Sequence, residues 1–432
     1  MCGENRKDRI MVDRLILNKE HLKSFLRKIG KKHELIAPVK NTSGDTLLEV
    51  IHSVDEVTLD LKTKPVMPPK NFFLPRSETL FKYQRKGGEY RFDEMLDDTP
   101  RILFGLRSCD LWGILFLDMI FQENFKDRYY LNRRINTVLI NIGCNEPMKN
   151  CFCRSTKSGP FLTHGYDLQL TDLGDRFFVE VGRPRGRELV EEWNYFFSPA
   201  TEKDREHQYE MILEAESRFH QIVDMDTAVS RLMNDEVDET LWEELGNRCQ
   251  NCGGCAYVCP TCYCFNIVDI PVSETEGERK RIQDSCTFSG FTRLAGGYNP
   301  RHERKRRIRR RFYHKLYYDS KKHRRPSCVG CGRCVEICFG RVDMINFIKM
   351  ICEHKEKKLR EDSLRLGEIL VEAGLLSREE LKKALEKQAG TGESLGEHLI
   401  NEGIITGEGV ACALGYQLKI PEDAGTGGSG GK

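Results

Sequence analysis

Two cysteine runs with identical spacing constrain this chain more than any other feature of its sequence. The segment RCQNCGGCAYVCP spaces its thiols as CxxCxxCxxxCP, at Cys249, Cys252, Cys255 and Cys259. The segment SCVGCGRCVEICF repeats that spacing at Cys328, Cys331, Cys334 and Cys338. Three thiolates spaced in this way wrap a loop around one metal cluster, and neighbouring glycines let the backbone approach it closely. We call the two runs the first ladder and the second ladder.

The spacing of both ladders is typical of 4Fe-4S clusters. In two-cluster ferredoxins the fourth cysteine of each run binds the other cluster. We therefore predict one cluster on Cys249, Cys252, Cys255 and Cys338, and a second cluster on Cys328, Cys331, Cys334 and Cys259. Structural zinc is the alternative, but its four ligands usually come as two separate pairs. Phe339 stands where a proline usually follows the last cysteine, which removes no ligand.

Composition and patterning exclude several classes of protein. The 18 cysteines gather in tight runs, whereas a secreted disulfide scaffold spreads them as a framework. The net charge of +2 argues against whole-chain attraction to nucleic acid or to an anionic membrane. No apolar signal core is visible, and no segment has the roughly 18 apolar residues of a membrane span. We therefore expect a cytoplasmic protein, in a reducing compartment that suits thiolate ligands.

The order of sequence patterns predicts an α+β protein built from modules. We expect an N-terminal mixed α/β domain, a helical connector and a dicluster ferredoxin-like module with a long insert. A helical linker, a small helical tandem-repeat domain and a flexible Gly-rich tail follow. The predicted bounds are 1–200, 201–245, 246–345, 346–362, 363–421 and 422–432.

Hydrophobic periodicity predicts individual helices and strands within these modules. We expect helices over residues 12–29, 111–121, 205–245 and 342–359. We expect strands over residues 46–51, 57–61, 102–106 and 137–142.

The insert between the ladders carries three further cysteines. It separates Cys259 from Cys328 by 68 residues and contains Cys262, Cys264 and Cys286. Two interpretations stay open for them, as extra metal ligands or as buried thiols, because buried free cysteine is common.

Longer motifs around the ladders resemble one known family. In the cysteine-rich part these are CPTCYCF, DSCTFSGFTRLAGGYNPR, HKLYY and CVGCGRCVEIC. In the N-terminal part they are PPKNFFLPRSETLFKY, FGLRSCDLWGILFLD and CFCRSTKSGPFLTHGYDLQLTD. Over residues 1–345 the chain resembles sulfhydrogenase beta subunits and the A subunits of anaerobic sulfite reductases. The resemblance implies an electron relay between a partner that contains flavin and a hydrogenase or reductase catalytic subunit.

Four cysteines of the N-terminal region form a separate constellation: Cys109, Cys144, Cys151 and Cys153. Cys109 and Cys144 each follow a predicted buried strand, and loops at strand ends can converge on one site. One interpretation is a third iron–sulfur cluster, and the other is a set of buried thiols near a partner-binding surface. The spacing is not that of a ferredoxin ladder, so both stay open.

A strongly basic run lies inside the cysteine-rich module. Residues 301–325 contain 13 Lys or Arg with aromatic residues among them, a pattern that alone is typical of nucleic-acid binding. Clusters with thiolate ligands are net anionic, so nearby cations stabilise them, and a basic face also steers an acidic partner. A solvated helix is a third interpretation. The context favours the electrostatic role, and we predict no nucleic-acid partner.

The C-terminal segment repeats itself with an offset of 29 residues, for example at Leu366-Gly367 and Leu395-Gly396. It resembles the N-terminal domain of type II secretion and pilus ATPases, which implies possible binding of cyclic di-GMP. The residues that the resemblance implies for nucleotide binding are Arg365, Leu366, Gly367, Gly374, Leu395, Gly396 and Gly403. Glycines at helix starts would present backbone amides to phosphate. A helical docking domain that binds no nucleotide is the alternative.

These patterns together favour an iron–sulfur electron-transfer subunit with no turnover in isolation. A second hypothesis is an adaptor that senses redox state and cyclic di-GMP, and a third is a DNA-binding iron–sulfur protein. Proton, polysulfide, sulfite and heterodisulfide all stay open as the terminal acceptor.

Overall fold

The computed structural model describes residues 14–123, 125–388, 393–407 and 409–410. Its fold is α+β, as the sequence predicts. The chain divides into two compact units, Met1–Ile348 and Lys349–Lys432. The boundaries predicted near residues 200 and 246 do not divide compact units of this kind, because both lie inside the first one.

An eight-stranded sheet is the centre of the first unit, with the strand order β10-β1-β9-β8-β7-β6-β2-β3. Its strands are β1 (Arg14–Asn18), β2 (Glu34–Lys40), β3 (Thr46–Val50), β6 (Arg101–Leu106), β7 (Thr137–Ile142), β8 (Leu168–Asp172), β9 (Arg176–Val181) and β10 (Phe197–Pro199). The pairs β2–β6, β6–β7 and β7–β8 are parallel, so β6 and β7 end at the same edge. The outer pairs are antiparallel.

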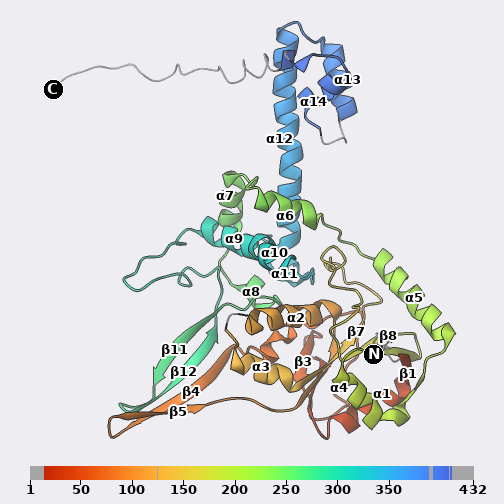
Figure 1. Ribbon diagram of the computed structural model, residues 1–432, viewed down its shortest axis with the longest axis vertical. Helices are drawn as coiled ribbons and strands as arrows, with labels where there is room; N and C mark the ends of the chain where they lie inside the picture. The colour runs from red at the N-terminus through yellow and green to blue at the C-terminus, as the bar shows by residue number, and fades with distance from the viewer. Residues whose placement is uncertain (1–13, 124, 389–392, 408, 411–432) are drawn as a thin grey trace, which may run out of the picture. The chain divides into compact units, whose positions relative to one another are not determined.

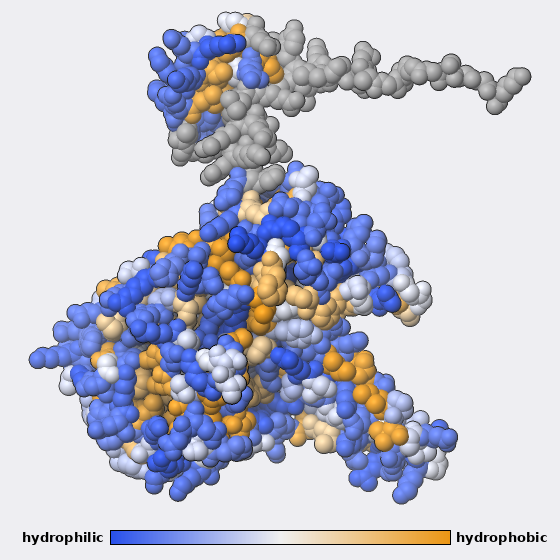
Figure 2. Space-filling view, turned by 180° about the vertical axis from the view of Figure 1, so that it is seen from behind, coloured by the Kyte–Doolittle hydropathy of each residue, from blue (hydrophilic) through white to orange (hydrophobic). Residues whose placement is uncertain are grey.

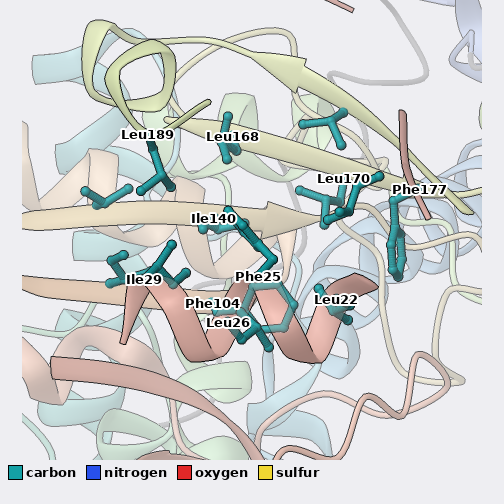
Figure 3. Packing of buried hydrophobic residues seen from close by; sticks show 14 of the residues in the cluster. Leu22, Phe25, Leu26, Ile29, Phe104, Ile140, Leu168, Leu170, Phe177 and Leu189 are labelled. Carbon is teal, nitrogen blue, oxygen red and sulfur yellow. The ribbon is translucent and has the colours of Figure 1, made fainter. Parts of the chain in front are cut away.

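Helices cover both faces of this sheet because its central strands are apolar on both sides. On one face, α1 (Lys19–Ile29) and α4 (Pro184–Glu192) pack over residues that include Ile102, Phe104 and Ile140 (Figure 3). On the other, α2 (Ser108–Gln122) and α3 (Arg128–Ile135) pack over Leu103 and Leu139. The alternation along β6 follows the two-residue period of a strand.

A second sheet joins two distant parts of the sequence (Figure 1). Its strand order is β11-β12-β4-β5, with β4 (Ser77–Lys86), β5 (Glu89–Glu94), β11 (Phe265–Pro271) and β12 (Glu276–Gln283). The insert therefore completes a sheet begun by the N-terminal region. Arg281 of β12 bonds to the Glu78 carboxylate at 2.6 Å and forms an ion pair with Asp127. These buried ion pairs connect the insert to the N-terminal region.

Short helices connect the large sheet to the ladders and surround them (Figure 1). They are α5 (Glu202–Ser217), α6 (Met225–Met233), α7 (Glu239–Arg248), α8 (Gly254–Tyr257), α9 (Arg304–Phe312), α10 (Asp319–His323) and α11 (Arg333–Ile337). A π-helical segment, η3 (Tyr313–Tyr318), joins α9 to α10, and the 3-10 turns are η1 (Pro69–Phe72) and η2 (Asn194–Phe196). Helix α2 packs closely against Pro260, the residue after Cys259, because its facing residue is Gly113. A Cβ at Gly113 would lie 2.6 Å from Pro260.

Three predicted elements differ from the structure. The predicted helix over residues 12–29 was wrong in its first part, because Arg14–Asn18 forms a strand that pairs with both β9 and β10. The predicted strand over residues 57–61 is a turn-containing segment without strand pairing. The predicted helix over residues 205–245 divides into three, since residues 218–224 leave the helix while Phe219 and Val223 become buried.

The second unit is helical and shows the predicted repeat in its packing. The long helix α12 (Met344–Glu372) leads into it, followed by α13 (Arg378–Gln388) and α14 (Leu395–Asn401). Gly367 packs against Leu381, and Gly396 packs against Val410 with 3.0 Å to a built Cβ, two contacts that are 29 residues apart. Gly374 and Gly403 have φ values of 70° and 68° at equivalent turns. The two copies are therefore alike in structure as well as in sequence.

None of the described helices has the length and apolarity needed to cross a membrane. Figure 2 shows the molecule from behind relative to Figure 1. Hydrophilic residues dominate the face seen there, with smaller apolar areas among them.

Candidate metal centres

The first ladder begins where α7 ends, and two left-handed residues shape its turn. Asn251 and Gly253 have φ values of 54° and 71°. A Cβ on Gly253 would lie 2.5 Å from the ring of Phe288, so the insert can approach only because this position is glycine. Cys252 is exposed, whereas Cys249 is half-buried. The first ladder is therefore a tight loop with one side open to solvent.

The second ladder has the same turn but a buried environment. Gly330 and Gly332 have φ values of 61° and 75°. A Cβ on Gly330 would lie 2.6 Å from the backbone of Cys153, because a loop of the N-terminal region packs directly on this turn. Cys328 and Cys331 are both buried. The same cysteine spacing is thus placed in two different environments.

The structure brings together the predicted sets of cysteines across the two ladders. Burial raises the pKa of Cys249 and Cys255, and the neighbouring Cys338 raises both further. Burial likewise raises the pKa of Cys328 to about 12, with a further contribution from Cys259. A negatively charged thiolate raises the pKa of a second thiol in this way only at short range. Cys259 also lines one cavity with Cys328, Cys331 and Cys334, which places the fourth cysteine of the first ladder beside the second ladder.

A cavity lies among thiols of the second set, with Cys255 of the first set also in its lining. Its lining includes Cys259, Cys328, Cys331 and Cys334. Among the described residues, no three His, Cys, Asp or Glu side chains converge closely enough to hold a single metal ion.

One face of the basic run supplies buried cations to this region. Arg307, Arg311 and Lys315 recur one helical turn apart along α9 and η3, and all three are buried. Burial alone lowers the pKa of Arg311, but the neighbouring Cys255 and Cys334 raise it above its ordinary value. Cys255 belongs to the first predicted set and Cys334 to the second. Arg311 therefore interacts with thiols of both sets.

Two lysines complete the positive environment. The Lys315 ammonium donates to the Thr261 hydroxyl at 2.6 Å, and burial lowers its pKa less than Cys259 and Cys262 raise it. Lys70, from η1, donates to the carbonyls of Ala256 and Cys262 at 2.9 and 2.8 Å. Among the described residues, no carboxylate forms an ion pair with either lysine. Cys259, Cys262 and Asp319 all raise the pKa of Lys315, whereas burial lowers the pKa of Lys70 more than Cys262 and Cys259 raise it.

The opposite face of the same helix is neutralised locally. Lys305 lies 3.1 Å from the carboxylates of Glu239 and Glu243, and Arg309 lies 3.0 Å from Asp235. Some of the charges that make the run resemble a nucleic-acid patch thus face buried thiols, and others pair with acidic side chains of this chain.

The three cysteines of the insert lie against the first ladder. The thiol of Cys262 hydrogen-bonds to that of Cys259, which lowers the pKa of Cys259. The thiol of Cys286 hydrogen-bonds to that of Cys264 and lowers the pKa of Cys264 to about 7. Each of these contacts joins only two thiols, which suits a buried thiol as well as a metal ligand. Both interpretations of Cys262, Cys264 and Cys286 therefore stay predictions.

The four cysteines of the N-terminal region also come together. Cys109, Cys144, Cys151 and Cys153 are all buried and line one cavity. Next to them, a fully buried ion pair joins Asp110 of α2 to Arg333 of α11, with N–O distances of 2.5 and 2.8 Å. Arg333 also donates to the Pro65 carbonyl at 2.9 Å. This pair fixes the second ladder to the N-terminal region.

The residues predicted for nucleotide binding are largely packing residues. Leu366 and Leu395 lie in the apolar core of the second unit. The expectation that Gly367 stands at a helix start was wrong, because α12 continues through it to Glu372. Gly396 does follow the N-cap Ser394 of α14. The side chain of Arg365 lies outside the described residues, as does the predicted 422–432 tail.

Sequence reasoning did not single out five charged residues at these sites: Lys64, Lys70, Arg107, Asp110 and Arg333. A signal was present for three of them, since Arg107, Asp110 and Arg333 each stand within two residues of a predicted ligand cysteine. Lys64 and Lys70 reach the thiols only through the tertiary fold.

Comparisons with known proteins agree with this geometry. The family described as 4Fe-4S dicluster domain matches residues 248–342, which span both ladders. The chain is also 33% identical over 337 residues to the protein named Sulfhydrogenase 2 subunit beta from Pyrococcus furiosus. The match covers 78% of this chain and 98% of that protein.

Proposed function

Since this chain belongs to the family of sulfhydrogenase beta subunits, we propose that it relays single electrons between partner subunits of a hydrogenase or sulfur reductase complex. Iron–sulfur clusters, when bound, supply one-electron chemistry over a wide range of potentials. We propose two 4Fe-4S clusters, on Cys249, Cys252, Cys255 and Cys338 and on Cys328, Cys331, Cys334 and Cys259. The main support is the cavity in which Cys259 of the first ladder lies with Cys328, Cys331 and Cys334 of the second.

The residues of this chain would shape such a relay through ligation and charge. The glycine turns let backbone amides face the ligand loops, and the buried cations offset the negative charge of the thiolates. Arg311 interacts with thiols of both sets, and Lys315 interacts with Cys259 and Cys328 of the second set. Both cations therefore favour the more negative, reduced state of a bound group.

The exposed side of the first ladder supports a contact with a redox partner. Cys252 is exposed, and Phe339, directly after Cys338, is 96% exposed. Electron exchange between proteins needs a close approach, and an apolar side chain beside the site favours docking. We propose two partners, of which one is a flavin-containing subunit; the other is the hydrogenase or reductase catalytic subunit.

An anaerobic reductive titration of the full chain tests this proposal. Two clusters predict the uptake of about two electrons per chain, with bleaching of visible absorbance. A colourless chain that takes up no electrons and carries zinc instead would contradict the proposal.

The adaptor hypothesis makes a different prediction. Removal of residues 360–432 leaves electron uptake unchanged if the chain is a relay, and abolishes regulation if it is an adaptor. For the C-terminal repeat, cyclic di-GMP binding and a nucleotide-free docking role stay separate predictions. Calorimetric titration of the full chain with cyclic di-GMP distinguishes them.

A further inference from the structure

The cavity shared by the four N-terminal cysteines lies at the carboxyl edge of two parallel strands. Cys109 is the second residue of α2, which follows β6, and Cys144 comes two residues after β7 ends. Because β6 and β7 are parallel neighbours, their following loops meet. The loop after β7 also carries Cys151 and Cys153. The topology therefore brings four thiols from two chain segments to one place.

Two buried cations line the same cavity. Arg107 is 4% exposed, and its Nη2 donates to the carbonyls of Asp60 and Thr63 at 2.9 and 2.7 Å. Its Nε and Nη1 atoms are buried and have no hydrogen-bond partner among the described residues. Lys64 places its ammonium 4.0 Å from the Cys151 sulfur and also forms an ion pair with Glu336 at 2.6 Å, so the unpartnered charge in the cavity is that of Arg107. A buried guanidinium with two unpartnered nitrogens indicates an anionic occupant, since leaving such donors unpaired is costly.

We propose that this cavity binds a third cluster of the 4Fe-4S type, held by Cys109, Cys144, Cys151 and Cys153. Four thiolates are the full ligand set of a cubane, and the two cations offset its negative charge. The inference rests on the proposed relay function, to which it adds one further one-electron site.

The third site lies directly beside the second ladder. The Phe152 amide donates to the Gly330 carbonyl at 2.8 Å, and the Cys151 thiol contacts the Cys331 carbonyl at 3.8 Å. Cys109, Cys151, Cys153 and Cys331 belong to one buried cluster of side chains.

The relay would therefore run from the exposed first ladder through the second ladder into the N-terminal region. Each step moves one electron between neighbouring clusters, with no change of bonds and no proton transfer.

The test is the iron content of the full chain, purified anaerobically and measured by native mass spectrometry. We expect about twelve iron atoms per chain, compared with about eight if only the ladders are occupied. The double variant Cys144→Ala/Cys153→Ala should lose about four iron atoms and keep the signals of the other two clusters. Cys352→Ala, in α12, is the matched control and should lose none.

Each outcome decides the matter. About eight irons in the unaltered chain, with no loss in the double variant, overturns the third site and leaves the proposed function intact. No iron at all overturns both. If the double variant fails to fold, the count in the unaltered chain still decides, and Arg107→Gln gives a second readout. In that variant, one of the three cluster reduction potentials should become more negative. If none of the three potentials changes, the assignment is contradicted.

Discussion

The two ladders have the same cysteine spacing but different surroundings. The first has an exposed cysteine, Cys252, and its predicted fourth ligand, Cys338, is followed by the fully exposed Phe339. The second has two buried cysteines and is covered by a loop of the N-terminal region. Spacing therefore determines which thiols can act as ligands, whereas the rest of the fold determines exposure and local charge. We infer that the first ladder exchanges electrons with a partner and the second passes them inward.

Removing one ligand from each ladder gives the largest expected effect and the most direct comparison. Cys252→Ser and Cys331→Ser should each lose about four iron atoms and abolish electron transfer through the chain. Only Cys331→Ser should also lower thermal stability markedly, because its site is buried. Iron analysis and thermal unfolding measure the two effects. Equal losses of stability in both variants would contradict the difference in environment.

The buried ion pair between Asp110 and Arg333 tests how firmly the second ladder is fixed. Asp110→Ala leaves the Arg333 charge buried without its carboxylate, which should cost about 3–5 kcal/mol of unfolding free energy. Glu202→Gln, which breaks the exposed pair with Arg205, should cost less than about 1 kcal/mol. Denaturant unfolding measures both. A cost for Asp110→Ala no larger than that of the control would show that the pair does not anchor the ladder.

Buried cations should separate the reduction potentials of the two clusters. Lys315→Met removes a positive charge beside Cys259 and Cys328, so the second cluster should become harder to reduce, by on the order of 50 mV. Arg311→Met should shift both clusters, since this residue interacts with Cys255 and Cys334. Redox titration followed by electron paramagnetic resonance measures each potential. Lys305→Met, on the outer face of α9, is the control and should shift neither.

The exposed side of the first ladder gives the smallest predicted effect. Phe339→Glu should slow electron exchange with a protein partner by about threefold, because it replaces an apolar contact with a charge. Exchange with a small dye should be unaffected. Tyr195→Glu, at an exposed position in η2, is the control for stopped-flow measurements. Slowing with the dye as well as the protein would indicate a damaged cluster instead of a docking defect.

The sequence predicted local features better than long-range ones. The ladders, the strand over residues 137–142 and the 29-residue repeat all depend on short spacing patterns, and the structure has each of them. The strand β1 was mistaken for helix because its pairing partners lie more than 150 residues away. The sheet that joins β4 to β12 was missed for the same reason.

The candidate site shows the same limit. The ligand cysteines could be proposed from spacing, and the basic run was recognised as a source of cations. Which cations are buried could not be predicted, because Arg311 and Arg309 differ only in the face of the helix that they occupy. Lys64 and Arg107 come to the four N-terminal cysteines only when the strands and loops are assembled.

Low-temperature electron paramagnetic resonance of the anaerobically purified full chain tests the central claim most directly. Stepwise reduction with dithionite should produce the signals of reduced cubanes that interact magnetically, because the proposed exchange of Cys259 and Cys338 between the two ladders places the clusters close together. A reduced protein without a paramagnetic signal, or with zinc in place of iron, would contradict the account.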